Sequence, residues 1–338
     1  MTESADNSAM SLTFPRSESP VDELDRRIIA ALQVNGRAGW RQIASVIGAP
    51  ERTVAAHGAE LIRSGRVGIH GFTLLPTGGR LEQMIVKLRC QPGMNRVMAA
   101  AAADRPGTVF TFLTTGEIDC ICEIVNDQDR NYSILLDELP GLPGVTSIDT
   151  STVIKLYKAT HQWLPTILDD DQVAALRDAS QPEELTGAIE LPPLSREEQE
   201  MARVLAEDGR ATIEELARAT ALSPASARRR LAHMQASGRL YTRTIVEPAV
   251  IGYPIDAVLR IRTVPGGIDR VARILADVPE IRYLAFTTGR HQLLAEIACS
   301  SQEALAAFLF RDDWTAYSLE VDTSLVIHAL KRSGRRRP

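Results

Sequence analysis

The sequence is short of the residues that mark the more specialised classes of protein. Its 338 residues include only 4 cysteines, 22 glycines and 18 prolines, which excludes a disulfide scaffold, a collagen-like chain and a low-complexity chain. It contains no uninterrupted run of about 18 apolar residues, so we expect no membrane-spanning helix and no membrane partner. The opening residues lack the basic start and apolar core of a signal peptide, and we therefore expect a cytoplasmic protein.

An excess of positive charge is also missing. Lys and Arg number 38 against 43 Asp and Glu, for a net charge of −5. The chain as a whole is therefore not a polybasic coat for nucleic acid or membranes, and any site for a polyanion must be local. The apolar share of 44% and the charged share of 24% are ordinary for a globular protein, and the length predicts about two domains.

An internal repeat organises the chain. One constant shift of 173 residues (205 − 32) carries Leu32 onto Leu205 and fits everything from about Leu24 to Lys158 without an insertion. It superposes Asn35-Gly36-Arg37-Ala38 on Asp208-Gly209-Arg210-Ala211, and Thr114-Thr115-Gly116 on Thr287-Thr288-Gly289. The chain is therefore predicted to be a tandem duplication.

The segment between the two copies is acidic and is interpreted as a linker over residues 159–194. Asp169, Asp170 and Asp171 are placed to cap a short helix over Gln172 to Ala179, because carboxylates favour the first turn of a helix. The prolines at 192 and 193 are expected to end it.

Each copy is predicted to begin with three short helices. In the first copy Leu24, Ile28 and Leu32 recur at helical spacing behind Asp22, a suitable N-cap. In the second copy Ser223 is placed as the N-cap of the third helix, with Pro224 at its first position. Three helices with a tight turn before the last are what a helix-turn-helix requires.

After these helices the hydrophobic period changes to two. Met84, Val86, Leu88 and Cys90 alternate with Ile85, Lys87 and Arg89, which predicts a strand. The later segments give the order β-α-β-β-α-β, a ferredoxin-like arrangement with helices on one face of an antiparallel sheet. The other face needs a partner. The two sheets of one chain could pair with each other or with those of another chain, and the sequence favours neither.

The motifs of both copies resemble the Lrp/AsnC, or feast/famine, transcription regulators. The resemblance rests on Leu24-Asp25, Ile28, Leu32, Asn35-Gly36-Arg37, Ile43-Ala44, Ile47-Gly48, Gly116-Glu117-Ile118-Asp119 and Leu142-Pro143-Gly144-Val145, followed by Thr150, Val153 and Lys158. It implies an α+β fold in which winged-helix-like helix-turn-helix modules alternate with ferredoxin-like βαββαβ (RAM-type) modules, duplicated in tandem.

The repeat and the resemblance together imply seven segments. They are a disordered N-terminus (1–20), helix-turn-helix domain 1 (21–80), ferredoxin-like effector and oligomerisation domain 1 (81–158), the acidic linker (159–194), helix-turn-helix domain 2 (195–250), ferredoxin-like domain 2 (251–331) and a basic tail (332–338).

The resemblance implies a sequence-specific regulator whose partner is double-stranded operator DNA. Arginine donates both to phosphates and to guanine edges in the major groove, so the basic third helix of the second copy is the expected reader. Its predicted DNA-binding residues are Ser223, Arg228, Arg229, Arg230 and His233. Alternatively, the three arginines form a solvated face paired with Glu214 and Glu215.

The first copy departs from this pattern, because Ala56 and His57 replace the basic pair and Gly58 follows. Arg52, Thr53 and His57 are its predicted DNA-binding residues. The alternative is a scaffold with weak affinity for DNA, and Gly58 is expected to lower helix stability by roughly 1 kcal/mol relative to alanine. The basic tail is interpreted either as a segment that follows phosphates or as a merely soluble end.

By the same resemblance a small effector, such as an amino acid, is expected at the turn that joins two strands of the first sheet. The predicted effector-binding residues are Thr114, Thr115, Gly116, Glu117 and Asp119. Asp119 would hold an ammonium group, and the backbone of the turn a carboxylate. Alternatively, Asp119 only orders the turn. We also expect the chain to form homo-oligomers.

No catalytic residue, metal site or cofactor is predicted, and we expect no enzyme. Cys120 and Cys122 lie on one face of a predicted strand without further ligands at metal-binding spacing, and the six histidines form no HExxH motif. Two alternatives are kept. The sirohaem decarboxylases resemble the same family, but their Arg/His-rich strand is not matched by Phe110 to Gly116 or Tyr283 to Gly289. The other is an effector-sensing oligomer that does not read DNA.

Overall fold

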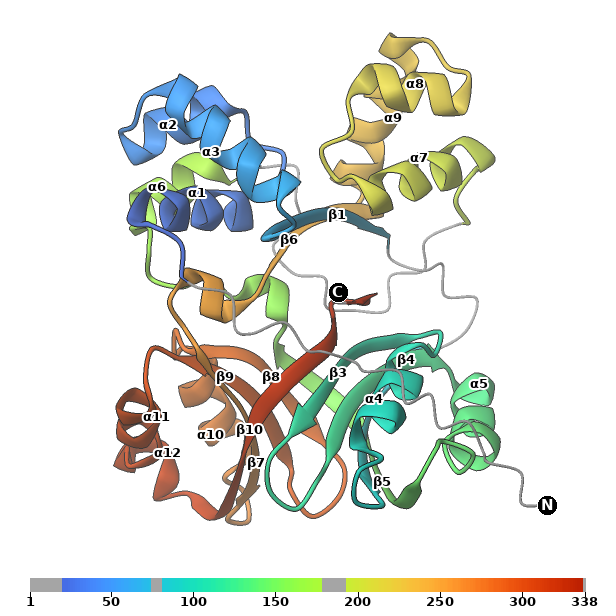
Figure 1. The fold of residues 1–338 in the computed structure, drawn as a ribbon, viewed down its shortest axis with the longest axis vertical. Coiled ribbons are helices and arrows are strands. Elements are labelled where there is room, and N and C mark those ends of the chain that lie inside the picture. The colour runs from blue at the N-terminus through green and yellow to red at the C-terminus, as the bar shows by residue number, and fades with distance from the viewer. Residues whose placement is uncertain (1–19, 74–80, 178–192, 337–338) are drawn as a thin grey trace, which may run out of the picture.

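The computed structural model describes residues 20–73, 81–177 and 193–336, which form two layers (Figure 1). Two helix-turn-helix modules lie side by side at one end of the molecule, and a β-barrel forms the other end. A pair of strands that continues from the two helical modules separates the layers. Within the described ranges, no helix is long and apolar enough to cross a membrane.

The six predicted helices of the two helical modules are present. They are α1 (Glu23–Val34), α2 (Trp40–Ile47) and α3 (Glu51–Arg63) in the first module, and α7 (Arg196–Glu207), α8 (Ile213–Thr220) and α9 (Pro224–Ala236) in the second. The predicted caps are confirmed, because the side chain of Asp22 accepts from the amide of Asp25 and that of Ser223 from the amide of Ser226. Each module buries its apolar stripes in its own core, around Leu32 and Leu231 respectively.

The two helical modules are joined to each other by strands and by a pair of arginines. β1 (Val67–Thr73) pairs antiparallel with β6 (Leu240–Val246), so that the strand after each third helix lies beside that of the other module. Arg37 donates to the carbonyls of Gly209 and Ala211, and Arg210 donates to those of Gly36 and Ala38. Arg37 and Arg210 are equivalent in the repeat, so this arginine clamp has the two-fold pseudosymmetry of the duplication.

The barrel contains strands from both ferredoxin-like modules. The first contributes β2 (Leu81–Cys90), β3 (Thr108–Thr114), β4 (Cys120–Asp127) and β5 (Val145–Lys158), and the second β7 (Ile255–Thr263), β8 (Ile281–Thr287), β9 (Leu293–Cys299) and β10 (Ser318–Arg332). The hydrogen-bonded order is β10-β3-β4-β2-β5-β8-β9-β7, and β10 also pairs with β7. The sheet therefore closes on itself, and the two modules of one chain pair with each other.

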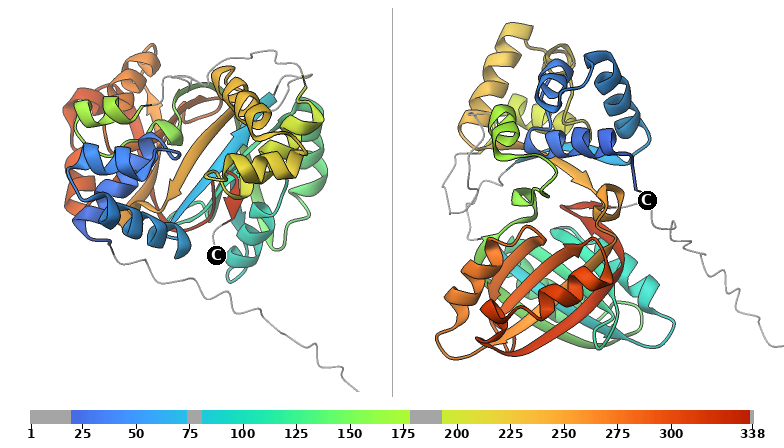
Figure 2. Two further views of the ribbon diagram at one scale, coloured as in Figure 1. Left: turned by 90° about the horizontal axis from the view of Figure 1, so that it is seen from above. Right: turned by 90° about the vertical axis from the view of Figure 1, so that its left-hand side faces the viewer.

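The helices of the ferredoxin-like modules cover the outside of the barrel (Figure 2). They are α4 (Asn95–Ala103) and α5 (Gln128–Ser133), continued by a π-helical turn (Ile134–Glu138), in the first module, and α10 (Ile268–Ala276), α11 (Gln302–Leu309) and α12 (Asp312–Thr315) in the second. The barrel interior is lined by apolar residues of both modules, including Ile85, Phe112, Ile121 and Ala285. Each sheet thus covers the apolar face that the other would expose to water.

The two glycine turns lock the barrel at equivalent places. The amide of Thr115 donates to the carbonyl of Leu325 at 2.9 Å, and the amide of Leu325 donates to Thr115 Oγ1 at 2.9 Å. The equivalent residues Thr288 and Thr152 make the same two contacts, both at 2.9 Å. Each turn therefore holds the long last strand of the other copy.

The segment interpreted as a linker is partly built into the fold. Residues 160–162 form a 3-10 turn, Trp163 is buried, and α6 (Asp170–Leu176) packs on the first helical module through Leu176. Asp169 caps α6 as expected. The helix begins two residues before its predicted start, and the end of its predicted range, like residues 1–19, lies outside the described residues.

The described part of the basic tail, residues 332–336, is held by ion pairs within the chain. Arg332 is buried and pairs with Glu247, Asp256 and Glu296. The next two arginines form the short strand β11 (Arg335–Arg336), in which Arg335 pairs with Glu207 and Arg336 with Asp104. These carboxylates lie far away in the sequence, so their proximity could not be seen before folding.

The arginine clamp predicts an unequal effect of two arginine truncations. Arg210→Ala removes two charge-assisted bonds, at 2.7 and 3.0 Å, and a guanidinium that lies 4.3 Å from the ring centre of Trp40. Urea unfolding followed by circular dichroism should show a loss of about 2 to 3 kcal/mol. Arg203→Ala, which removes an exposed i,i+3 pair with Glu200, is the control and should change stability little. Equal effects would contradict the clamp.

Candidate functional site

Helix α9 presents an exposed basic surface. Arg228, Arg229 and His233 are exposed, and in the described part of the chain no carboxylate pairs with them. Arg230 is half-buried and turns toward the start of α7, where it donates to Ser195 Oγ at 2.8 Å and lies 3.3 Å from Glu197. Two of the three consecutive arginines are therefore exposed and available to a ligand. Among the described residues, Glu214 and Glu215 form no ion pair with any of the three. Ser223 caps the helix and lies exposed at its N-terminus.

Helix α3 has a different outer surface. The positions equivalent to Arg228, Arg229 and His233 hold Ala55, Ala56 and Glu60, by the shift of 173 residues (228 − 55). Of its predicted DNA-binding residues, Arg52 is exposed at the start of the helix and Thr53 is half-buried. Glu60 and Arg63 pair with each other on the exposed surface. An acidic residue in place of His233 opposes contact with phosphate, so the two helices differ in charge as well as in length of side chain.

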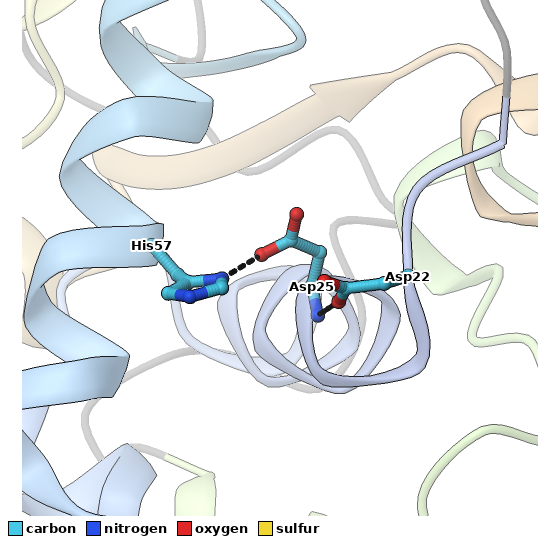
Figure 3. Close-up of side chains that lie close together, drawn as sticks. All are labelled: Asp22, Asp25 and His57. Atoms are coloured by element: carbon cyan, nitrogen blue, oxygen red, sulfur yellow. Dashed lines mark hydrogen bonds and ion pairs between the residues drawn. The ribbon is translucent and has the colours of Figure 1, made fainter.

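His57, the third residue predicted to bind DNA from α3, faces its own module. Its Nδ1 lies 2.7 Å from Asp25 Oδ1 on α1 (Figure 3). Asp22 lies close by, and one ligand atom from each of the three residues falls within 4.8 Å of the others. Asp22 is already engaged as the N-cap of α1 and Asp25 by the histidine. The cluster is therefore explained by helix capping and a hydrogen bond between His57 and Asp25 that joins two helices, and no spacing in the sequence could have revealed it.

Gly58 has a packing role that its helix propensity does not show. A Cβ at this position would lie 2.4 Å from Trp40 Cζ3, so the indole of Trp40 occupies the space of the missing side chain. Trp40 and Gly58 correspond to Ile213 and Leu231 in the second copy. Where the second module packs two medium-sized side chains, the first module therefore packs the indole of Trp40 against a glycine. The guanidinium of Arg210, part of the arginine clamp, lies over the ring of Trp40.

The predicted effector turn is used to close the barrel. Thr114 Oγ1 donates to the carbonyl of Ile118 at 2.6 Å, Thr115 binds Leu325, and Glu117 pairs with Arg89. Asp119 accepts from the amide of Cys90 at 2.9 Å, which is the turn-ordering contact of the alternative interpretation, and Gly116 has a φ of 91°. The five residues are brought together as expected, but none of them lines the large cavity described next. Their effector role stays a prediction.

A cavity of about 490 Å³ lies between the helical layer and the mouth of the barrel. The helical layer contributes the end of α1 and residues of β1 and β6, and the barrel contributes residues of β3, β4 and β8 and the end of β10. Six aromatic residues line it: Phe72, Phe110, Phe112, Trp163, Tyr241 and Tyr283. Its volume falls in the range of about 300 to 1,000 Å³ that ligand sites occupy. Sequence reasoning missed it, because its lining comes from both copies and from the supposed linker.

Glu123 forms one polar end of this cavity. It is buried on β4, accepts from Tyr283 Oη at 2.8 Å and is also bound by Gln83. Burial raises its pKa to about 7, against the smaller lowering effect of these two hydrogen bonds, while Glu296 raises it and Arg243 lowers it slightly. Glu123 therefore changes its charge near neutral pH.

Two arginines that line the cavity, Arg282 and Arg332, are paired with carboxylates of the chain. Arg282 lies 2.5 Å from Glu296 and also near Asp256, and Arg332 lies 2.6 Å from the same Glu296 oxygen. Arg332 further pairs with Glu247. This buried network joins β7, β8, β9 and β10 at the mouth of the barrel, and its guanidinium groups have their counter-ions within the chain.

Replacement of Gly58 tests the packing of Trp40. Gly58→Ala should lower the free energy of unfolding by about 1 to 2 kcal/mol, since the overpacking cost outweighs the gain of roughly 1 kcal/mol in helix propensity. In a Trp40→Ile background the same replacement should be neutral or stabilising, because the indole is gone. Urea unfolding of the four proteins measures the coupling. A Gly58→Ala protein more stable than the wild type would contradict this account.

The raised pKa of Glu123 predicts a pH dependence of stability. Because its pKa in the folded state lies above the ordinary 4.5 of the unfolded chain, folding is favoured by protonation, and this contribution is lost as pH rises from about 4.5 to about 7. Relative to Glu123→Gln, the wild type should lose at most about 3 kcal/mol between pH 4.5 and pH 8. Melting temperatures of both proteins across this range give the difference, and parallel profiles would contradict it.

Comparison with known proteins agrees with these two kinds of module. Residues 21–56 and 199–235 match the AsnC-type helix-turn-helix domain, and residues 83–163 and 256–336 match the Lrp/AsnC ligand binding domain. The HTH-type transcriptional regulator FL11 of Pyrococcus horikoshii is 29% identical over 142 residues, which cover 42% of this chain and 94% of the regulator. FL11 of Pyrococcus abyssi is 28% identical over 143 residues, 41% of this chain and 93% of the regulator. Each relative therefore corresponds to one unit of the repeat.

A solved structure shares the two-unit architecture. The siroheme decarboxylase NirDL, in a co-complex with an iron-uroporphyrin III analogue, has a TM-score of 0.57 at 12% identity, covering 92% of this chain and 93% of that one. At this identity the likeness shows the fold alone. The family matches cover both units of the repeat, and the relatives in Pyrococcus are transcriptional regulators of the same type. The chain therefore belongs to the Lrp/AsnC family of helix-turn-helix, DNA-binding transcription regulators, with two units in tandem.

Proposed function

We propose that this regulator reads operator DNA asymmetrically, chiefly through helix α9. The observation that carries the proposal is the pair of exposed arginines, Arg228 and Arg229, next to exposed His233, where α3 has Ala55, Ala56 and Glu60. Arginine and histidine donate to base edges and phosphates, whereas alanine and glutamate do not donate. Helix α3 then contributes mainly through Arg52 at its N-terminal end and follows the backbone more than the bases.

The arrangement of the two helical modules supports binding by a single chain. The β1–β6 pair and the arginine clamp hold both modules at one end of the molecule, away from the barrel (Figure 1). Two helix-turn-helix modules related by a two-fold axis meet two half-sites on the same face of DNA. One chain thus does the work of a homodimer, and its preferred operator has one strongly specified and one weakly specified half-site.

Arginine replacements on α9 test this reading. Arg229→Ala should weaken binding to DNA from upstream of the chain's own gene by about 10- to 100-fold, since a bidentate base contact contributes about 1 to 3 kcal/mol. Arg230→Ala should weaken it less, because that side chain is held by Ser195. Arg273→Ala, an exposed arginine on α10 of the barrel, is the control. Fluorescence anisotropy and footprinting measure both affinity and protected half-site, and unchanged affinity for Arg229→Ala would contradict the proposal.

The turn at Thr114 to Asp119 is retained as the proposed amino-acid site, and oligomers of the chain are proposed with it. Because the turn groups are engaged within the chain, a second chain docked at this end of the barrel would have to complete the site. Exposed apolar side chains support such docking. Ile154 and Ile327, which are equivalent in the repeat, are 56% and 63% exposed on β5 and β10.

A tetrapyrrole-modifying enzyme is the second candidate function, favoured by the likeness to NirDL over nearly the whole chain. Decarboxylation of a polycarboxylated tetrapyrrole needs several cations free to bind the acid groups. In the cavity Arg282 and Arg332 are instead paired with Glu296 and its neighbours. The charge of the site therefore supports the regulator without enzymatic activity.

A further inference from the structure

The cavity between the helical layer and the barrel contains a guanidinium group that forms no ion pair with any described residue. Arg243 lies on β6, opposite His70 of β1, and lines the cavity. In the described part of the chain no carboxylate lies within 4.0 Å of it, Glu123 of the same cavity acts on it only at longer range, and its Nε has no hydrogen-bond partner. Arginine stays charged even where burial lowers its pKa, as it does here. An unpaired cation in a desolvated place costs stability, and an anionic ligand would remove that cost.

The neighbours of Arg243 form a place for one anionic group next to an apolar body. The guanidinium carbon lies 4.8 Å from the ring centre of Tyr241 and 5.2 Å from that of Phe72, and the two rings stack on each other. Nη2 donates to His161 Nδ1 at 3.0 Å. Burial, together with Arg243, lowers the pKa of His161 to about 3, so the imidazole is neutral and accepts from the guanidinium. Aromatic surface and one free cation thus lie together.

The repeat shows that this end of the cavity is not duplicated. Arg243 corresponds to His70, Arg282 to Val109 and Arg332 to Ala159, by the shift of 173 residues (243 − 70). All three cations therefore come from the second copy. Two of them are paired with Glu296 and its neighbours, so that among the described residues Arg243 is the cavity-lining arginine outside an ion pair. The positive end of the cavity is therefore present once and not twice, despite the repeat.

The cavity also touches the parts of the chain that carry the DNA-binding helices. β6 follows α9 after the turn at Gly238, β1 follows α3, and both strands line the cavity. The opposite wall belongs to the barrel, including Phe110 and Tyr283. A bound molecule would contact both layers at once, and any change in their relative placement would alter its contacts.

We propose that this cavity binds a small amphipathic monocarboxylate, whose carboxylate pairs with Arg243 and whose apolar or aromatic body packs on Phe72 and Tyr241, and that its occupancy is coupled to DNA affinity. The coupling rests on the DNA binding proposed above, whereas the binding of the ligand does not. The site is separate from the turn at Asp119. By linkage, the ligand changes DNA affinity by the same factor by which DNA changes ligand affinity.

The ligand class is tested by isothermal titration calorimetry of the full chain with four probes. Indole-3-acetate and 3-phenylpropionate carry a carboxylate only, L-tryptophan carries a carboxylate and an ammonium group, and tryptamine carries an ammonium group only. We expect binding of one or more carboxylate probes and none of tryptamine. If L-tryptophan binds better than indole-3-acetate, Glu123, which also lines the cavity, holds the ammonium group. If no carboxylate binds, the proposal fails.

Variants separate the site from its rivals. Arg243→Met should lower affinity for the bound probe at least 10-fold, and circular dichroism of the ligand-free protein checks that the variant is folded. Arg243→Lys should restore part of the affinity, and Arg273→Met on α10 is the matched control. If Asp119→Asn abolishes binding and Arg243→Met does not, the effector binds at the turn and the proposal is overturned. A Soret shift of uroporphyrin that disappears in Arg243→Met would assign the cavity to a tetrapyrrole and overturn it as well.

The coupling is measured apart from occupancy. Anisotropy with DNA from upstream of the chain's own gene is recorded with and without a saturating concentration of the bound probe. A change in affinity of threefold or more that disappears in Arg243→Met supports the coupling. Ligand binding without any change overturns the coupling but leaves the site. Loss of DNA binding in the ligand-free protein would instead count against the proposed function, so the two failures are distinguishable.

Discussion

The rest of the structure depends on the need of each ferredoxin-like sheet to cover one apolar face. A four-stranded sheet with helices on one side leaves its other side to water, and the second copy in the same chain covers it. Pairing of β5 with β8 and of β10 with β3 closes the barrel, and the reciprocal contacts of Thr115 and Thr288 hold the long strands in place. Because the barrel closes within one chain, the two copies are related by a pseudo-two-fold axis, and the β1–β6 pair and the arginine clamp follow the same symmetry.

The barrel and the arginine clamp are pseudosymmetric, but the exposed surfaces and the cavity lining of the two copies are not. Residues that hold the copies together have kept their equivalence, as Arg37 and Arg210 show by donating to equivalent carbonyls. Residues on the exposed surface of the third helix or in the cavity have not, since Arg229 corresponds to Ala56 and Arg243 to His70. A homodimer cannot differ in this way, because both subunits share one sequence. Duplication within one chain allows α9 to expose arginines while α3 carries the packing of Trp40 on Gly58.

Local patterns were sufficient for most of the elements and for the exposed part of the candidate DNA-binding surface. The helices, their caps at Asp22 and Ser223 and the β-α-β-β-α-β order follow from period, caps and turns, which act over a few residues. Arg230 could not be assigned in this way, because its partner Ser195 lies 35 residues earlier. The role of Gly58 was hidden for the same reason, since propensity describes an isolated helix and Trp40 belongs to another one.

By itself the sequence determined the duplication, the type and order of the elements, the family and the concentration of arginine on α9. Those properties depend on periodicity and on motifs that are continuous along the chain. Only the tertiary structure decided that the two sheets close on each other, that the described parts of the supposed linker and tail are built into the fold, and that a cavity lined by Arg243 lies between the two layers. These features are contacts between segments that are distant in the sequence. The hydrophobic effect that drives them is non-directional, so the shape and charge of the folded segments decide which of them pack together.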